Sequence, residues 1–113
     1  MGYKQMSNVI KELYDVVCDR KVDSAEGSYT GYLFAQGIDK ILKKVGEEAA
    51  ETIIAAKNGN KEDIANEVCD LFYHLLVMMA ERGVSYDDID AILNERAKKM
   101  GNLKTFKQVD KNT

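Results

Sequence analysis

Apolar and polar residues alternate along the chain with the spacing of helices rather than of strands. The first predicted helix covers residues 7–19. Four of its apolar side chains fall at i, i+3, i+4 and i+7 on one face: Ile10, Leu13, Tyr14 and Val17. After a polar loop at 23–28, a second helical segment covers 30–57, with Gly37 as its expected interruption. We expect its buried face to consist of Ile38, Ile41, Leu42, Val45, Ala49, Thr52, Ile53 and Ala56.

A very short turn separates this segment from the next one. The tripeptide at 58–60, Asn-Gly-Asn, combines a helix stop with a new N-cap, so the following helix is expected to fold back antiparallel. This third helix covers 61–82 and ends at Gly83. A fourth helix, capped by Ser85 and carrying acidic residues in its first turn, runs to about residue 100.

The third helix is apolar around most of its circumference. Its apolar residues form one broad face and spread over much of the rest: Ile64, Val68, Leu71, Phe72, Leu75, Met78 and Met79, then Cys69, Tyr73, Leu76 and Val77. Four short helices cannot cover a helix on all sides, so we predict a homodimer or larger homo-oligomer. The predicted fold is all-α, an antiparallel helical bundle completed by oligomerisation. It forms a single domain over 1–113, with a core at about 7–99 and a polar tail at 101–113.

Composition narrows the possible functions. With 45% hydrophobic and 31% charged residues and a formal net charge of −3, the chain lacks the concentrated basic face that nucleic-acid binding needs. The longest apolar run, at 75–80, is far shorter than the roughly 20 residues that span a bilayer, so we expect no membrane contact. No signal-like segment is present at the N-terminus, and Cys18 and Cys69 lie far apart. We therefore expect a cytoplasmic protein with reduced thiols.

Two groups of carboxylates carry the candidate chemistry. Glu47, Glu48 and Glu51 lie within about one turn of the second segment, and Glu67 and Asp70 are three residues apart on the third helix. Because the turn at 58–60 lies between the two groups, folding back there places them at similar heights on neighbouring helices. The five carboxylates are then expected to surround one small volume.

Carboxylates gathered in this way repel one another unless cations bind or protons are taken up. The fitting cation is hard and prefers oxygen, Mg²⁺ or Mn²⁺, because Cys and His do not occur at ligand spacing. Three lysines, Lys40, Lys43 and Lys44, precede the acidic group by two turns or less. Lys40 and Lys44 project to the same side as the acids, where an ammonium group can meet a phosphate oxygen.

An alternative is that these acids form ordinary solvated helix faces, stabilised by pairs such as Lys44 and Glu48. The third helix argues against it, because Glu67 projects only about 20° from Met78 on the apolar face. Aromatic residues are weaker candidates. His74, the single histidine, is interpreted as a packed or capping side chain. Tyr29 and Tyr32 have the rings to stack on a base, although tyrosines near a loop more often pack.

The spacing Glu47-Glu48-x-x-Glu51 followed by Glu67-x-x-Asp70 resembles the signature of the all-α, MazG-type nucleotide pyrophosphohydrolases. The stretch at 28–51, with its Ser-Tyr-Thr and Lys-Lys-Val-Gly-Glu-Glu segments, is similar to the phosphoribosyl-ATP pyrophosphatase family of histidine biosynthesis. The resemblance covers about residues 8–99. It implies Mg²⁺-dependent hydrolysis of 1-(5-phosphoribosyl)-ATP to 1-(5-phosphoribosyl)-AMP and pyrophosphate, the second step of L-histidine biosynthesis.

The same resemblance implies roles for individual residues. The implied metal ligands are Glu48, Glu51, Glu67 and Asp70. Glu47 is then an auxiliary ligand or the residue that orients the attacking water. The implied phosphate contacts are Lys40, Lys43 and Lys44. The resemblance leaves open which residues hold the second ribose phosphate; Arg20 and Lys21 are basic residues near the loop at 23–28.

Two other functions remain open. A house-cleaning pyrophosphohydrolase of noncanonical nucleoside triphosphates would share the acidic residues but have no use for a second ribose phosphate. A non-catalytic helical oligomerisation module would carry the same acids as solvated faces. Substitution of Glu67 or Asp70 separates either enzyme from the non-catalytic module, because only an enzyme loses activity.

Overall fold

The computed structural model describes residues 6–103, which form helices and contain no strand. The five helices are α1 (Met6–Val22), α2 (Tyr29–Gln36), α3 (Ile38–Asn58), α4 (Lys61–Arg82) and α5 (Tyr86–Leu103). The all-α prediction is confirmed. Most of the predicted polar tail lies outside the described residues. Within the described range, none of the helices is long and apolar enough to cross a bilayer.

Side chains and glycines at the helix ends explain where most helices begin and stop. Asn60 caps α4 by accepting a 3.0 Å hydrogen bond from the backbone N–H of Asp63. Gly59 takes the left-handed conformation that ends α3, with φ of 83°, and donates to the carbonyl of Ala55. Gly37, with φ of 95°, divides the predicted second segment into α2 and α3.

Two helix ends differ from the prediction. α1 extends to Val22 rather than stopping near Asp19, because Lys21 is anchored on α4. Its ammonium donates to the Ala80 carbonyl at 3.3 Å and lies 3.6 Å from a carboxylate oxygen of Glu81. At the other end, α5 continues through Gly101 to Leu103.

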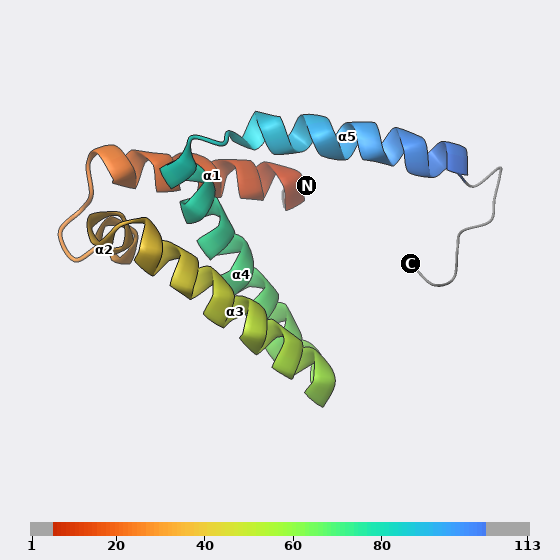
Figure 1. Cartoon of the computed structure of the whole chain (residues 1–113), viewed down its shortest axis with the longest axis horizontal. Helices are drawn as coiled ribbons and strands as arrows, with labels where there is room; N and C mark the ends of the chain where they lie inside the picture. Colours follow the sequence, from red (N-terminus) through yellow and green to blue (C-terminus); the bar gives the residue numbers. More distant parts are fainter. Residues whose placement is uncertain (1–5, 104–113) are drawn as a thin grey trace, which may run out of the picture.

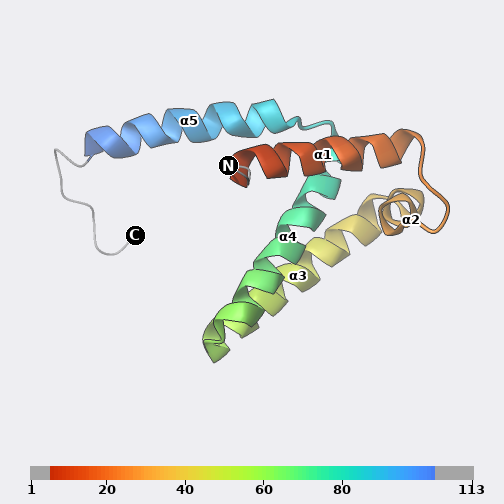
Figure 2. The same cartoon turned by 180° about the vertical axis from the view of Figure 1, so that it is seen from behind.

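Helices α3 and α4 form a long antiparallel hairpin, while α1 crosses its open end and α2 lies beside it (Figures 1 and 2). The core sits where α1, α2 and the inner halves of the hairpin meet. It consists of Tyr14, Val17, Leu33, Ile41, Leu76, Val77, Met79 and Ala80. The Tyr14 hydroxyl also donates to the Val84 carbonyl at 2.7 Å, which fixes the chain leaving α4.

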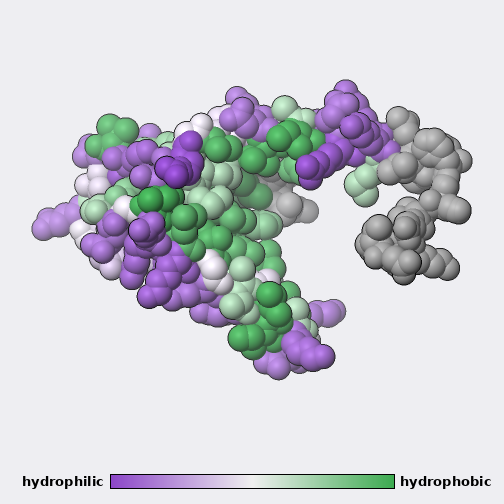
Figure 3. Space-filling view, viewed as in Figure 1, coloured by the Kyte–Doolittle hydropathy of each residue, from purple (hydrophilic) through white to green (hydrophobic). Residues whose placement is uncertain are grey.

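Large apolar faces of this single chain remain open. Its radius of gyration is 16.9 Å, whereas a compact domain of this length has about 13 Å. Ala56 on α3 is exposed, although the sequence predicts it to be buried. The prediction of a buried Leu42 and Ile53 on α3 is also wrong for the isolated chain; Ile53 lies on the outer half of the hairpin, which has no third helix against it. Their exposed fractions are 45% and 69%. Every residue at 90–101 on α5 is exposed. Figure 3 shows hydrophobic residues, in green, on the surface of the chain between hydrophilic ones.

Candidate active site

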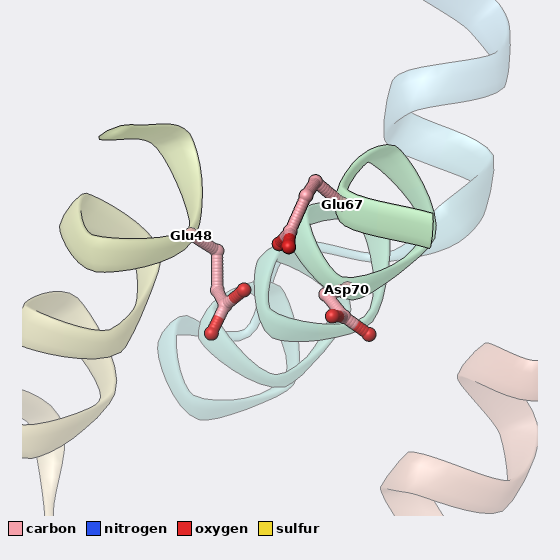
Figure 4. A group of neighbouring side chains, drawn as sticks. All are labelled: Glu48, Glu67 and Asp70. Atoms are coloured by element: carbon pink, nitrogen blue, oxygen red, sulfur yellow. The ribbon is translucent and has the colours of Figure 1, made fainter. Parts of the chain in front are cut away.

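Three carboxylates meet across the hairpin formed by α3 and α4. Glu48 on α3 points toward Glu67 and Asp70 on α4 (Figure 4), and one carboxylate oxygen from each residue lies within 4.8 Å of those of the other two. The antiparallel register set by the turn at 58–60 places them at the same height, as predicted. We call these three residues the carboxylate group.

Thr52 holds the two helices together at this height. Its hydroxyl lies 2.7 Å from the carbonyl oxygen of Glu48 on its own helix and 3.3 Å from that of Glu67 on the other helix. The sequence places Thr52 on the buried face of its helix but does not indicate that it bridges two backbones. This contact fixes the separation of two members of the carboxylate group.

The described part of the chain neutralises the charge of the carboxylate group only in part, through Lys44 beside Glu48. Glu48 is buried, with 7% of its surface exposed, and Glu67 is half-buried. One oxygen of each, Oε1, is buried without a hydrogen-bond partner among the described residues. A buried polar atom left in this state costs about 1–3 kcal/mol, and more when it is charged. Burial, and next the negative charge of Glu51, raise the pKa of Glu67.

The two remaining acids of the predicted set are placed differently. Glu51 lies near Glu67, and both residues line a cavity of about 210 Å³. Glu47 is exposed, and its carboxylate oxygen lies 3.2 Å from the ammonium nitrogen of Lys44. The structure thus brings together Glu48, Glu67 and Asp70, places Glu51 beside them, and leaves Glu47 paired with a lysine.

Among the three predicted lysines, Lys44 is the one for which the described residues provide ion pairs. Besides Glu47, it lies 3.7 Å from Oε2 of Glu48, so one ammonium reaches both acids. Its hydrogen bond to Glu47 raises the pKa of Lys44, and this lysine therefore stays charged. Lys40, one turn earlier, is half-buried and Lys43 is exposed.

His74 connects the carboxylate group to α2. Its imidazole is buried, with Nδ1 2.8 Å from the Asp70 carbonyl oxygen and Nε2 3.1 Å from the Tyr29 hydroxyl. The interpretation of His74 as a packed side chain is confirmed. Its link to Tyr29 depends on the packing of α2 against α4, and the sequence contained no signal for it.

This arrangement fits a divalent cation bound through oxygen. All three members of the carboxylate group offer carboxylate oxygens, the preferred ligands of hard cations, and two buried oxygens are free to accept one. Bound positive charge would also remove the repulsion that raises the pKa of Glu67. The hairpin therefore contains a possible metal site made of acidic residues.

Comparisons with known proteins show the family of the chain. The chain matches the family described as "Phosphoribosyl-ATP pyrophosphohydrolase" over residues 10–97. It is 59% identical over 97 residues to the "Phosphoribosyl-ATP pyrophosphatase" of Clostridium novyi (strain NT), covering 86% of this chain and 88% of that protein. The protein of the same name from Streptococcus thermophilus (strain ATCC BAA-491 / LMD-9) is 52% identical over 101 residues, 89% of this chain and 97% of its own length.

A longer relative contains the same kind of domain. The "Histidine biosynthesis bifunctional protein HisIE" of Thermoanaerobacter pseudethanolicus (strain ATCC 33223 / 39E) is 59% identical over 83 residues, which are 74% of this chain and 38% of that protein. These identities and the family match, which spans most of the described helices, assign the chain to the same family. The chain belongs to the phosphoribosyl-ATP pyrophosphohydrolase family, as the resemblance of its stretch at 28–51 implies.

Proposed function

We propose that this protein hydrolyses 1-(5-phosphoribosyl)-ATP to 1-(5-phosphoribosyl)-AMP and pyrophosphate, the second step of L-histidine biosynthesis, and that it uses Mg²⁺. Membership of a pyrophosphohydrolase family supports the reaction. The observation that carries the site is the carboxylate group, in which two buried oxygens face the same space without a hydrogen-bond partner in the described chain. A cytoplasmic location stays a prediction from the sequence.

The carboxylate group would hold the metal, with Glu51 as a further ligand from α3. Mg²⁺, or Mn²⁺ in its place, would neutralise phosphate charge and stabilise the departing pyrophosphate. The products require water to add across the anhydride bond between the α and β phosphates, with one proton of the water taken up by a base. Glu47 is exposed and outside the carboxylate group, so it suits orienting that water and accepting its proton.

Lys44 would bind the polyphosphate. In the structure its ammonium is shared between Glu47 and Glu48, at 3.2 and 3.7 Å. A cation on the carboxylate group would weaken the hold of Glu48 on this lysine, which then has a free donor for a phosphate oxygen. Lys40 and Lys43, on the preceding turn of α3, would extend this positive surface.

A homodimer or larger homo-oligomer would complete the bundle. On α1, three exposed residues at i, i+4 and i+7 form an apolar stripe, and further exposed apolar residues lie on α3 and α5: Val9, Leu13 and Val16, then Ile53, Ile54, Ile92 and Leu93. Apolar surface of this kind marks protein–protein contact. The expected result from light scattering in solution is a mass at least twice the 12.7 kDa of the chain.

Pyrophosphate release tests the proposed reaction. The purified protein is given Mg²⁺ and, at equal concentrations, phosphoribosyl-ATP, ATP or dUTP. We expect strong preference for phosphoribosyl-ATP and complete loss of release with a chelator. Release from the plain triphosphates instead would indicate a house-cleaning enzyme, and no release from any of them by folded, metal-loaded protein would contradict the proposal.

A further inference from the structure

A cavity of about 630 Å³ lies against α2 and the loop that precedes it. Small-molecule sites in proteins commonly have volumes of about 300–1,000 Å³. The residues that matter for the argument are Ser24, Ser28, Tyr29, Gly31, Tyr32 and Ala35. The residues Tyr29 and Tyr32 are 46% and 45% exposed, and their rings are stacked, with centroids 6.1 Å apart and planes 25° apart.

Two exposed aromatic rings in one cavity wall offer a flat, apolar surface. Such a surface suits an aromatic ligand, because bases stack on tyrosine with little dependence on their identity. The carboxylate group and the lysines of α3 suit phosphates and a metal ion, and they do not use these rings. The cavity is therefore a separate feature that the proposed chemistry leaves without a role.

Tyr29 is held in place by two residues of α4, His74 and Tyr73. His74 Nδ1 faces the Asp70 carbonyl, which can only accept, so in the neutral imidazole Nδ1 carries the proton. Nε2 then accepts, and the Tyr29 hydroxyl donates to it at 3.1 Å. The ring also stacks with Tyr73, at 6.2 Å and 30°. These contacts fix the ring before any ligand arrives.

The same contacts connect the cavity to the carboxylate group. Two hydrogen bonds lead from Tyr29 through His74 to the backbone of Asp70, a member of that group. Burial raises the pKa of Tyr29, and the positive charge of Lys44 opposes this shift. A nucleotide with its phosphates at Lys44 would have its base near this wall.

Gly31 sets the shape of the cavity. A Cβ atom at this position would lie 2.5 Å from both the Cβ and the Oγ of Ser24, so any side chain would push the loop away from α2. The loop therefore approaches the helix closely only because residue 31 is glycine. This gives a second way to alter the cavity without removing a ring.

We propose that this cavity is the base-binding subsite, in which Tyr29 and Tyr32 stack on the purine ring of the nucleotide while its phosphates lie at the α3–α4 hairpin. The assignment rests on the proposed function. Stacking of one base on an aromatic side chain contributes enough that its removal weakens binding by roughly 10-fold to 100-fold. The effect belongs in binding and KM rather than in kcat, because the rings do not touch the scissile bond.

The direct test uses a 2-aminopurine nucleoside triphosphate, whose fluorescence is quenched when its ring stacks on an aromatic side chain. The protein has no tryptophan, and the variants below assign the quenching to individual tyrosines. We expect quenching by the wild type with Mg²⁺, loss of quenching with Tyr32→Ala, and recovery with Tyr32→Phe. Gln36→Ala is the matched control, because Gln36 is exposed on α2 but is not among the residues that line the cavity.

Kinetics with phosphoribosyl-ATP give the second measurement. Tyr32→Ala is expected to raise KM by roughly 10-fold or more with little change in kcat. Gly31→Ala, which displaces the loop, is expected to weaken quenching without removing either ring. Circular dichroism confirms that each variant is folded.

Three results would overturn the base subsite, and a fourth would separate it from the proposed function. Absence of quenching by the wild type, or full quenching by folded Tyr32→Ala and Tyr29→Ala variants, would overturn the base subsite. A raised KM with unchanged quenching would also overturn it, because the cavity would then hold another part of the substrate. If the wild type releases no pyrophosphate from phosphoribosyl-ATP yet shows tyrosine-dependent quenching, the proposed function fails and the base subsite stands.

Discussion

Carboxylates at two places in this molecule have opposite consequences for the fold. At the start of α5, a carboxylate oxygen of Asp88 accepts from the Ser85 backbone N–H at 2.9 Å, and the Ser85 hydroxyl accepts from the Asp88 N–H at 3.0 Å. This reciprocal capping box satisfies two backbone donors and places a negative charge where the helix dipole favours it. On the α3–α4 hairpin, Glu48 and Glu67 instead keep buried oxygens for which the described chain supplies no partner.

The comparison separates acids that stabilise the fold from acids whose buried oxygens lack a partner within the described chain and can bind a metal ion. A capping carboxylate is solvated and paired, so removing it lowers stability. A member of the carboxylate group is repelled by its neighbours. Removing its charge is therefore expected to leave the stability of the fold unchanged or higher, and to remove the proposed activity. The two sites therefore predict opposite responses to the same kind of substitution.

The largest expected effect is on activity in Glu67→Gln. The substitution keeps the size of the side chain but removes its charge, so we expect turnover to fall by about 10³-fold and stability to stay the same or rise. The measurements are pyrophosphate release and thermal unfolding. Asp88→Asn serves as the control, because it also neutralises one acid but lies at a helix start. A folded, fully active Glu67→Gln protein would contradict the site assignment.

The second expected effect is stabilisation by the metal. Because Mg²⁺ would bind the folded hairpin and not the unfolded chain, a concentration of 100 times Kd would add about 2.7 kcal/mol to the free energy of unfolding. Thermal unfolding with Mg²⁺ and with chelator measures the difference. Asp70→Asn is expected to reduce this shift, and Asp88→Asn to keep it. An equal shift in both variants would place the metal elsewhere.

A smaller effect is expected at the cap of α5. Ser85→Ala removes the acceptor for the Asp88 N–H and should lower the free energy of unfolding by about 1 kcal/mol. Urea unfolding measures the loss, while the binding of Mg²⁺ should be unchanged. A loss of activity comparable to that of Glu67→Gln would erase the distinction between the two sites.

The smallest expected effect is a pH dependence of the metal-free protein. Burial and Glu51 raise the pKa of Glu67 above its ordinary value of 4.5, so the folded state holds this proton more tightly than the unfolded chain. This contribution to stability is fully present below pH 4.5 and is lost as the pH rises through the raised pKa. Urea midpoints in chelator are expected to show this decrease, and Glu67→Gln to flatten it relative to Asp88→Asn. An identical pH profile in the two variants would refute this explanation.

Local signals in the sequence predicted most of the helices. The Asn-Gly-Asn turn at 58–60 sets the register of the hairpin, and the structure places the helix stop and the cap at Gly59 and Asn60. Local signals failed where a distant contact decides the outcome. The end of α1 depends on the contact of Lys21 with the carbonyl of Ala80, which lies 59 positions away in the chain. No rule of helix capping includes such a contact.

The candidate site likewise has features that local sequence predicted and features that packing decided. The spacing of the acids predicted the two groups of carboxylates, because residues three or four apart share a helix face. The turn at 58–60 predicted their common height on adjacent helices, and the longer stretch at 28–51 indicated the family. The rotation of one helix against the other decides which acids meet, and that follows from side-chain packing. Acid spacing alone does not separate Glu48 from Glu47. The family resemblance implies different roles for them, and the tertiary structure places Glu48 in the carboxylate group and Glu47 beside Lys44.

Packing also decides what surrounds those acids. Three features depend on segments that are distant in the sequence, so no local signal predicts them. They are the exposure of Ile53, the contact of the Thr52 hydroxyl with the Glu67 carbonyl, and the hydrogen bond from Tyr29 to His74. Sequence determined the helices and the charges of this protein because both depend on neighbouring residues. The tertiary structure decided which side chains are buried and which ones contact each other across helices, because both depend on how whole helices pack against one another.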